Sequence, residues 1–242
     1  MTSFVLKLIA ALSMLLDHAG LILFPGREIF RVLGRLACPI YAFCIAEGFR
    51  HTRNRLRYFL RVFVLGLLCQ IVYTVVDHEL YLGILITFSL SIILMAALDC
   101  VKTALRGEKS ALAGALERLL GREISPAADR ALSTGVFCAG VLGVFLLTTF
   151  VTVDYGFFGV MLPVCASLFE ERGQRLVMFT ACLLALAITM TDDFTVQYWS
   201  LAAVPLLALY NGKPGRVRMK YFFYIFYPLH LAVLYGISML MK

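Results

Sequence analysis

The stretch LSMLLDHAGLIL, residues 12–23, places an aspartate and a histidine side by side inside an apolar run that extends from Phe4 to Phe24. A run of this length is sufficient to cross the hydrocarbon core of a bilayer as an α-helix. We interpret it as a retained helix rather than a cleaved signal peptide, because many similar runs follow it. Ionisable groups at membrane depth are costly and usually functional, so Asp17 and His18 require an explanation.

The rest of the chain has the same apolar character. Its 242 residues are 61% hydrophobic and only 15% charged, with a mean hydropathy of +0.88. This composition indicates an integral membrane protein. We predict an all-α, polytopic helical bundle of about nine transmembrane helices that forms a single domain over residues 1–242. The predicted helices lie at about 4–24, 30–48, 59–76, 81–98, 132–151, 155–169, 176–191, 196–210 and 221–241.

The basic residues predict the orientation of this bundle. If nine helices alternate across the membrane, 18 of the 22 Lys and Arg residues fall on one side. The positive-inside rule then places the N-terminus in the cytoplasm and the C-terminus outside. Topology accounts for the net charge of +7, so we predict membrane lipids as partners and no nucleic acid.

The longest basic connection contains EKSALAGALERLLGRE, residues 108–123. Its leucines at 112, 116, 119 and 120 follow helical spacing, which predicts an amphipathic helix along the cytoplasmic interface. The seven cysteines lie mostly in apolar runs without a C-x-x-C pair, so we interpret them as buried small hydrophobes and predict no metal site.

Lys7 and His18 are 11 residues apart, close to three helical turns, and therefore share one face of the first helix. Asp17 points about 100° away from His18, which favours a partner on another helix. Arg31 and Arg35 of the second helix lie at similar depth, and Arg35 is the preferred ion-pair partner of Asp17. Two interpretations stay open for Asp17 and His18: a reactive site, or contacts that only fasten helices together.

The first cytoplasmic loop contains FRHTRNRLRYFLR, residues 49–61. Its arginines either mark topology or bind a polyphosphate, whose oxygens match guanidinium groups. Glu47, beside this loop, is either part of a plain salt bridge or a contact to substrate.

The last helix begins with KYFFYIFYPLHLAVLY, residues 220–235. Tyr227 and His230 share a face, Tyr224 lies one turn before Tyr227, and Pro228 predicts a kink because it lacks an amide hydrogen. The aromatic stripe is typical of packing, but a second intramembrane histidine also favours a lined cavity.

Five segments together resemble the TraX family of membrane proteins, which is named for a conjugative-plasmid protein that acetylates the N-terminus of pilin. They cover residues 14 to 230 and read MLLDHAG, GRLACPIYAFCIAEGFRHTRNRLRYFLR, DYGFFGV, LYNGKPG and KYFFYIFYPLH. More distantly, the spacing of Lys7 and His18 is similar to that of a basic residue and a histidine in the acyltransferase-three membrane enzymes. Heparan-α-glucosaminide N-acetyltransferase is similar in task.

These resemblances imply a multi-pass enzyme of the bacterial inner (cytoplasmic) membrane that moves an acetyl group from cytosolic acetyl-CoA to an amine or hydroxyl outside. His18 is then the general base and Arg35 the electrophilic support beside Asp17. We assign donor binding to Lys7, Arg53, Arg57, Arg61, Lys220 and Tyr224, and the acceptor side or pore to Glu47, Asp154, Tyr227 and His230.

Several alternatives stay open at this point. The acceptor is a peptide N-terminus, an amino sugar or a polysaccharide, and His18 acts either as a base or as a transient acetyl carrier. A transporter with an intramembrane His-Asp-Arg site and a non-catalytic assembly factor of a secretion or conjugation system are the competing functions. The oligomeric state is unknown.

Overall fold

The computed structural model describes residues 1–77, 81–190, 194–215 and 220–241, with side chains described in these ranges except at 72–77, 194–195 and 220–224. The described chain is helical, as predicted, and its one β-bridge is isolated, between Leu82 and Val153. The helices are α1 (Ser3–Ile22), α2 (Glu28–Gly34), α3 (Ala37–His51), α4 (Arg55–Asp77), α5 (Ile84–Leu105), α6 (Ala111–Leu120), α7 (Pro126–Phe150), α8 (Gly156–Cys165), α9 (Arg172–Thr189), α10 (Phe194–Gln197), the 3₁₀ helix η1 (Tyr198–Ala202), α11 (Ala203–Ala208) and α12 (Lys220–Leu240).

Each of the nine predicted apolar runs lies on one or more of these helices. Within the described residues, five helical segments are long and apolar enough to cross a membrane: Ser3–Ile22, Glu28–His51 (α2 and α3 taken together), Ile84–Leu105, Pro126–Phe150 and Arg172–Thr189. By the length and composition of these helices, the chain is a helical membrane protein. The count of nine spans and the orientation of the termini stay predictions.

The predicted helix at 30–48 is interrupted in the structure. Helix α2 ends at Gly34 and α3 begins at Ala37. Pro39 has no amide hydrogen to donate to the carbonyl of Arg35. Separately, the hydroxyl of Ser13 donates to the carbonyl oxygens of Leu33 and Gly34, the last two residues of α2. A side chain from α1 therefore satisfies the backbone where α2 stops.

The predicted helix at 196–210 is also broken, into α10, η1 and α11. Pro205 removes one backbone donor from this stretch, and the chain tightens into a 3₁₀ turn immediately before it. Helix α8 is shorter than the predicted run at 155–169 and carries Pro163 inside it. At ten residues, α8 is too short to cross a bilayer by itself.

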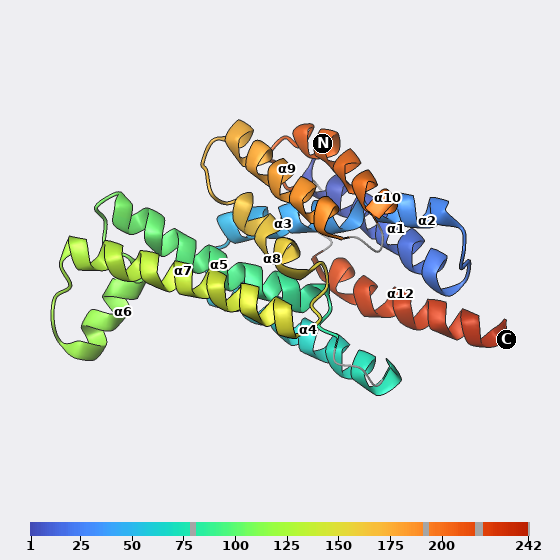
Figure 1. Cartoon of the computed structure of the whole chain (residues 1–242), viewed down its shortest axis with the longest axis horizontal. Coiled ribbons are helices and arrows are strands. Elements are labelled where there is room, and N and C mark those ends of the chain that lie inside the picture. The colour runs from blue at the N-terminus through green and yellow to red at the C-terminus, as the bar shows by residue number, and fades with distance from the viewer. Residues whose placement is uncertain (78–80, 191–193, 216–219, 242) are drawn as a thin grey trace. The chain divides into compact units, whose positions relative to one another are not determined.

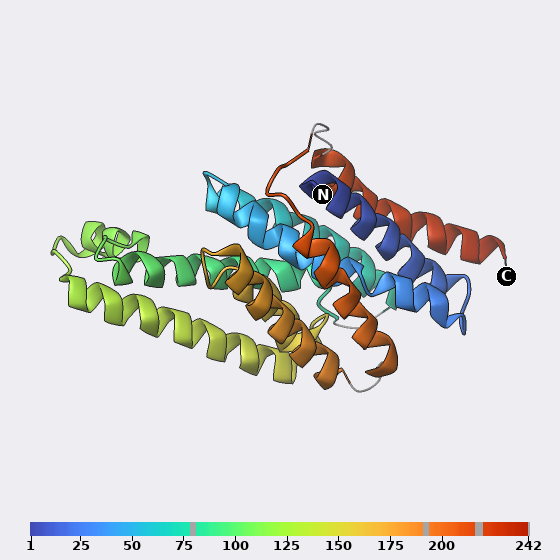
Figure 2. The ribbon, with the colours of Figure 1, turned by 90° about the horizontal axis from the view of Figure 1, so that it is seen from above.

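The described residues cluster in two compact units. Unit 1 contains Met1–Gly48 and Phe169–Lys242, and unit 2 contains Phe49–Leu168. The prediction of a single domain stays a prediction. In unit 1, α1 packs against α2 and lies side by side with α12, although these helices are the first and last of the chain (Figures 1 and 2).

The start of α1 is bound by the loop that precedes α12. The amide hydrogens of Ser3 and Phe4 are donated to the carbonyl oxygens of Lys213 and Pro214, at N···O distances of 2.9 and 3.2 Å. The hydroxyl of Thr2 accepts the amide hydrogen of Val5. The first turn of a helix has no backbone acceptors of its own, so this loop completes α1.

Two glycines allow α1 and α2 to approach closely. A Cβ atom at Gly20 would lie 2.6 Å from the Cβ of Phe30, and one at Gly34 would lie 2.3 Å from the Cβ of Asp17. Real Cβ atoms essentially never come this close, so both positions require glycine. The close approach brings the Asp17 end of α1 against α2.

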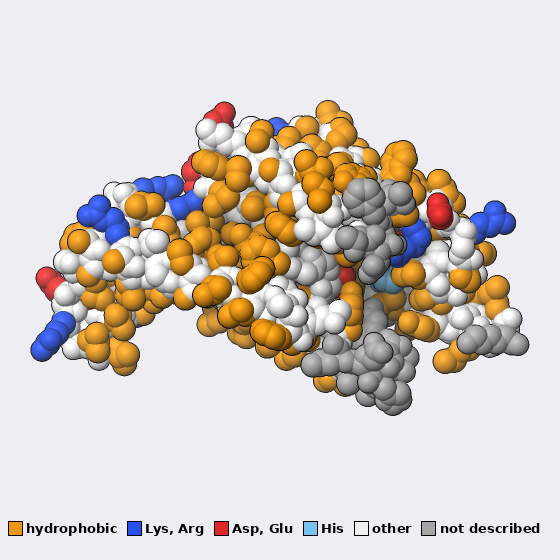
Figure 3. Space-filling view, in the orientation of Figure 1, with side chains coloured by type: hydrophobic (Ala, Val, Ile, Leu, Met, Phe, Trp, Pro, Cys, Tyr) orange, Lys and Arg blue, Asp and Glu red, His pale blue; other side chains and the backbone are white. Residues whose placement is uncertain are grey.

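In unit 2, α5 packs against α4, α7 and α8. The hydroxyl of Ser91 lies 2.8 Å from the carbonyl oxygen of Val160 and fastens α5 to α8. Helix α7 buries little of its surface within the described chain, and apolar side chains cover the visible face of the unit (Figure 3). Exposed apolar faces of this kind are typical of helices that contact lipid or a partner.

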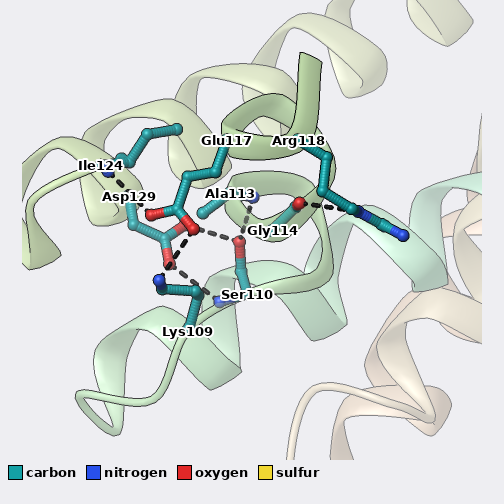
Figure 4. Close-up of polar contacts among 8 residues, drawn as sticks. All are labelled: Lys109, Ser110, Ala113, Gly114, Glu117, Arg118, Ile124 and Asp129. Carbon is teal, nitrogen blue, oxygen red and sulfur yellow. Dashed lines mark hydrogen bonds and ion pairs between the residues drawn. The ribbon is translucent and has the colours of Figure 1, made fainter. Parts of the chain in front are cut away.

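Helix α6 lies at the turn between α5 and α7 (Figure 1). Ser110 caps its start, and the carboxylate of Asp129 from α7 accepts both the amide hydrogen of Ser110, at 2.9 Å, and its hydroxyl, at 2.6 Å (Figure 4). Ser133 donates to the same carboxylate at 3.0 Å. The predicted amphipathic helix is therefore confirmed as a helix, and a buried polar cluster joins it to α7.

Candidate functional site

Two histidine side chains meet in unit 1, between the first and last helices. Nδ1 of His18 lies 3.2 Å from Nε2 of His230, and the ring centroids are 4.9 Å apart. His18 is partly buried and His230 is 4% exposed. The structure therefore brings together two sequence-predicted site residues that are 212 positions apart.

Backbone carbonyls determine which nitrogens carry hydrogen. Nδ1 of His18 lies 2.9 Å from the carbonyl oxygen of Met14, and Nδ1 of His230 lies 2.8 Å from that of Phe226. A carbonyl oxygen only accepts, so each Nδ1 must donate. In the neutral pair, Nε2 of His230 is then an acceptor that faces the Nδ1 hydrogen of His18.

The second ring nitrogen of His18, Nε2, carries a basic lone pair. Because Nδ1 carries the hydrogen of the neutral ring, Nε2 of His18 has none. It makes no hydrogen bond to any residue for which side chains are described. An imidazole nitrogen in this state can accept a proton from a reactant.

Aromatic rings surround His230 on its own helix. The ring of Phe226 stacks on it at a centroid distance of 5.1 Å, and Tyr227 lies edge-on at 5.9 Å. These contacts limit rotation of the imidazole and support its position against His18. Tyr227 and His230 share a face of α12, as the spacing predicts.

Asp17 pairs with Arg31 across α1 and α2. The Oδ1 atom of Asp17 lies 2.9 Å from Nη1 of Arg31, and both side chains are largely buried. Arg31 also acts electrostatically on His18. The sequence analysis placed Arg31 at this depth but preferred Arg35, which is 4% exposed at the end of α2, and the pairing of Arg35 with Asp17 stays a prediction.

A second polar group of unit 1 surrounds Glu47. Glu47 of α3 forms an ion pair with Arg175 of α9, and both residues are buried. The guanidinium of Arg175 lies over the ring of Phe43 at 5.7 Å. No pattern in the sequence identifies Arg175 as the partner of Glu47.

Two further buried polar residues of unit 1 were missed. Gln197 and Ser200 are fully buried, and their side-chain polar atoms have no hydrogen-bond partner among the described residues. Buried polar groups are normally hydrogen-bonded to protein or water. The two residues lie three positions apart at the start of an apolar segment, and this spacing is the sequence signal that could have identified them.

The remaining predicted residues fall elsewhere. Lys7 lies on α1, close enough to Cys44 of α3 for electrostatic interaction. In unit 2, Asp154 accepts a hydrogen bond from the hydroxyl of Tyr81 at 2.8 Å. The loop arginines predicted to bind the donor also belong to unit 2; these are Arg53, Arg57 and Arg61. Two further predicted donor residues, Lys220 and Tyr224, have side chains outside the described residues.

The described residues contain no group of three or more His, Cys, Asp or Glu side chains able to hold a metal ion.

The family of TraX proteins matches residues 3–238, nearly the whole chain. This chain belongs to the TraX family. It is also 27% identical over its full length to 97% of a protein of Dichelobacter nodosus described as "Probable fimbrial assembly protein FimC, serogroup H1". A shorter match, 32% identical over 74 residues, covers 31% of this chain and 28% of the protein RP591 of Rickettsia prowazekii (strain Madrid E). No solved structure matches the chain.

Proposed function

We propose that this TraX family protein is a membrane acetyltransferase in which His18 is the general base. The observation that carries the proposal is the state of His18: its Nδ1 hydrogen is directed to acceptors, and its Nε2 lone pair is available. Acyl transfer to an amine or hydroxyl requires a positioned base of this kind. The association of the family with pilin acetylation supports the same reaction class.

The proposed reaction begins when an acceptor amine or hydroxyl attacks the carbonyl carbon of the acetyl thioester. Nε2 of His18 takes the proton of the attacking group as the new bond forms. The carbon–sulfur bond then breaks, and the departing thiolate takes that proton from His18, which releases coenzyme A and leaves the histidine neutral. We assign stabilisation of the transient oxyanion to Arg35, a buried cation at the end of α2.

We propose acetyl-CoA as the donor and a molecule destined for the cell surface as the acceptor. Donor phosphates require cations, for which we assign the loop arginines Arg53, Arg57 and Arg61 of unit 2. The relative of Dichelobacter nodosus is described as a probable fimbrial assembly protein, which favours a peptide N-terminus of an appendage subunit over an amino sugar or polysaccharide.

We place the protein in the bacterial inner membrane with α6 on the cytoplasmic headgroups. Short loops join α6 to α5 and α7, both long enough to span. Its end carries Leu119, which is 80% exposed, beside the exposed Arg118 and Arg122. A spin label at Leu119 should become less accessible to a polar relaxing agent when nanodiscs contain anionic lipid. A label at Gly135, in the middle of α7, is the control, and equal accessibility of Leu119 in both lipids would contradict this placement.

The test of the enzymatic function is a direct assay. Purified protein in nanodiscs, incubated with acetyl-CoA and peptides that mimic a pilin N-terminus, should add one acetyl group to the peptide, detected by mass spectrometry. Acetyl-CoA at 100 times its Kd should also stabilise the fold by about 2.7 kcal/mol. Replacement of His51, an exposed histidine at the end of α3, by Gln is the matched control and should preserve transfer.

The competing functions predict different results in the same assay. A non-catalytic assembly factor gives neither acetyl transfer nor stabilisation by acetyl-CoA. A transporter that uses the histidine pair as a proton relay gives no acetylated peptide but couples proton movement to a solute. Either outcome with well-folded protein would remove the acetyltransferase proposal.

A further inference from the structure

We infer that His230 is a positioning residue that acts through His18: it accepts the Nδ1 hydrogen of His18 and stabilises the positive charge that His18 acquires in the reaction. This inference deepens the proposed function and depends on it for the catalytic consequence. The hydrogen bond itself can be tested without any assay of acetyl transfer.

The geometry assigns the direction of the hydrogen bond. The carbonyl oxygen of Phe226 accepts the Nδ1 hydrogen of His230, so Nε2 of His230 can only accept in the neutral ring. That nitrogen lies 3.2 Å from Nδ1 of His18, which must donate because it also faces the carbonyl oxygen of Met14. The hydrogen of His18 is therefore shared between a carbonyl and an imidazole.

The carboxylate of Asp17, the residue next to His18, does not lie in the position of this acceptor. In a Ser-His-Asp triad, an aspartate accepts the Nδ1 hydrogen and stabilises the imidazolium. Here Asp17 is the adjacent residue on the same helix, points about 100° away, and pairs with Arg31. His230 lies where the triad aspartate would lie, and it is a neutral acceptor.

Proton transfer to Nε2 of His18 strengthens this contact. The ring then becomes an imidazolium with hydrogens on both nitrogens, and the bond to Nε2 of His230 becomes charge-assisted. The positive charge is shared with a second imidazole, which can itself hold a proton. Burial of His18 and then the charge of Arg31 oppose a positive charge on this ring, and an acceptor at Nδ1 offsets part of that cost.

Nuclear magnetic resonance tests the hydrogen bond directly in the full-length protein labelled with ¹⁵N-histidine. We expect a ¹⁵N–¹⁵N coupling across the hydrogen bond between Nδ1 of His18 and Nε2 of His230. The resonances are assigned by their loss in His18→Gln and His230→Gln, and His51→Gln should leave the coupling unchanged. A folded wild-type protein without this coupling overturns the inference, whether or not it transfers acetyl groups.

Kinetics test the catalytic consequence. His230→Leu removes the acceptor and should lower kcat roughly 10- to 100-fold, the range expected for loss of a hydrogen bond to a charged group, with little change in KM for acetyl-CoA. His230→Gln offers a carbonyl oxygen in a similar place and should recover part of that loss. Equal losses in the two variants, or a change confined to KM, would contradict the role.

The outcomes separate the two proposals. If wild-type protein shows the coupling but never acetylates a peptide, the histidine pair exists and the acetyltransferase function is wrong. If wild-type protein is active and shows no coupling, His18 works without His230 and only this inference fails. If His230→Leu does not fold, the coupling in wild type and the kcat of His230→Gln still decide.

Discussion

The histidine pair of unit 1 and the junction of α6 with α7 in unit 2 are both polar clusters in a largely apolar chain, yet they differ in how their polar atoms are used. At the junction, the carboxylate of Asp129 accepts hydrogen bonds from the backbone and hydroxyl of Ser110 (Figure 4). It also accepts one from the hydroxyl of Ser133. In the histidine pair, one imidazole nitrogen has no described partner.

We propose that this difference distinguishes a structural cluster from a reactive one. A fully satisfied network rigidifies its surroundings and has no lone pair directed at a reactant. A basic nitrogen held by a satisfied ring, as in His18, combines fixed orientation with a free acceptor. We therefore expect changes in the two clusters to affect different properties, stability at the junction and reaction rate at the histidines.

The largest expected effect is on the reaction. His18→Ala should lower the rate of acetyl transfer at least about 100-fold, because it removes the principal acid–base group. Binding of acetyl-CoA, measured by thermal shift, should be nearly unchanged. Retention of more than about a hundredth of the wild-type rate would move the base to His230.

The same measurements separate a base from an acetyl carrier. A carrier accumulates acetyl-enzyme and releases coenzyme A without an acceptor, whereas a base does neither. Mass spectrometry of protein incubated with acetyl-CoA alone detects the acetylated species. We expect none on His18.

Asp129→Ala should have the opposite profile. It removes three hydrogen bonds to a buried carboxylate and leaves Ser110 and Ser133 with unmatched donors. Loss of hydrogen bonds to a charged group costs about 1.5 to 3 kcal/mol each in comparable cases, so the free energy of unfolding should fall by at least about that amount. The transfer rate per folded molecule should be unchanged, and a proportional loss of rate would break the distinction between the two clusters.

Gly34→Ala tests packing beside the histidine site. The new Cβ would lie 2.3 Å from the Cβ of Asp17, so α1 and α2 must move apart. Overpacking of this kind typically costs about 1 to 3 kcal/mol, and we expect a lower melting temperature together with a weakened Asp17–Arg31 pair. Gly143→Ala is the matched control, because nothing lies within 4 Å of its Cβ position. Equal melting temperatures for the two variants would show that α1 and α2 are not closely packed.

The smallest effect is a pH dependence at the end of α6. The amide hydrogen of Ile124, donated at 2.8 Å, and then the side chain of Lys109 hold the pKa of Glu117 below its ordinary value of 4.5 (Figure 4). A lowered folded pKa stabilises the fold above the unfolded value, and this contribution is lost as the pH falls through the folded one. The Ile124 amide shift should therefore titrate below pH 4.5 in wild type and stay constant in Glu117→Gln. Titration at the ordinary value would contradict the contact.

The fold could largely be predicted from hydropathy, because each predicted apolar run lies on one or more helices. The interruptions could not. The break before α3 depends on Ser13 reaching the last carbonyls of α2, and such a contact between helices leaves no periodic signal. Pro205 signalled the second break, but the 3₁₀ turn before it depends on packing against α9.

The sequence predicted residues of the candidate site but not the contacts between them. The depth and face of His18 identified it, and a second histidine on α12 suggested a shared cavity. The contact between them could not be derived, since sequence distance carries no information on which helices of a bundle are neighbours. The contact of Arg31 with Asp17 likewise depends on the rotation of α2 about its axis, which the sequence spacing leaves open.

The contact of α1 with α12 has a consequence for biosynthesis. Unit 1 is made of the two ends of the chain, and all of unit 2 is translated between them. In a nascent chain, His18 is therefore synthesised long before its partner His230. The amide hydrogens of Ser3 and Phe4 are likewise synthesised long before their acceptors, the carbonyl oxygens of residues 213 and 214. Truncated translation products lack the completed histidine pair, so we expect the proposed chemistry to reach its full rate only after α12 has been inserted.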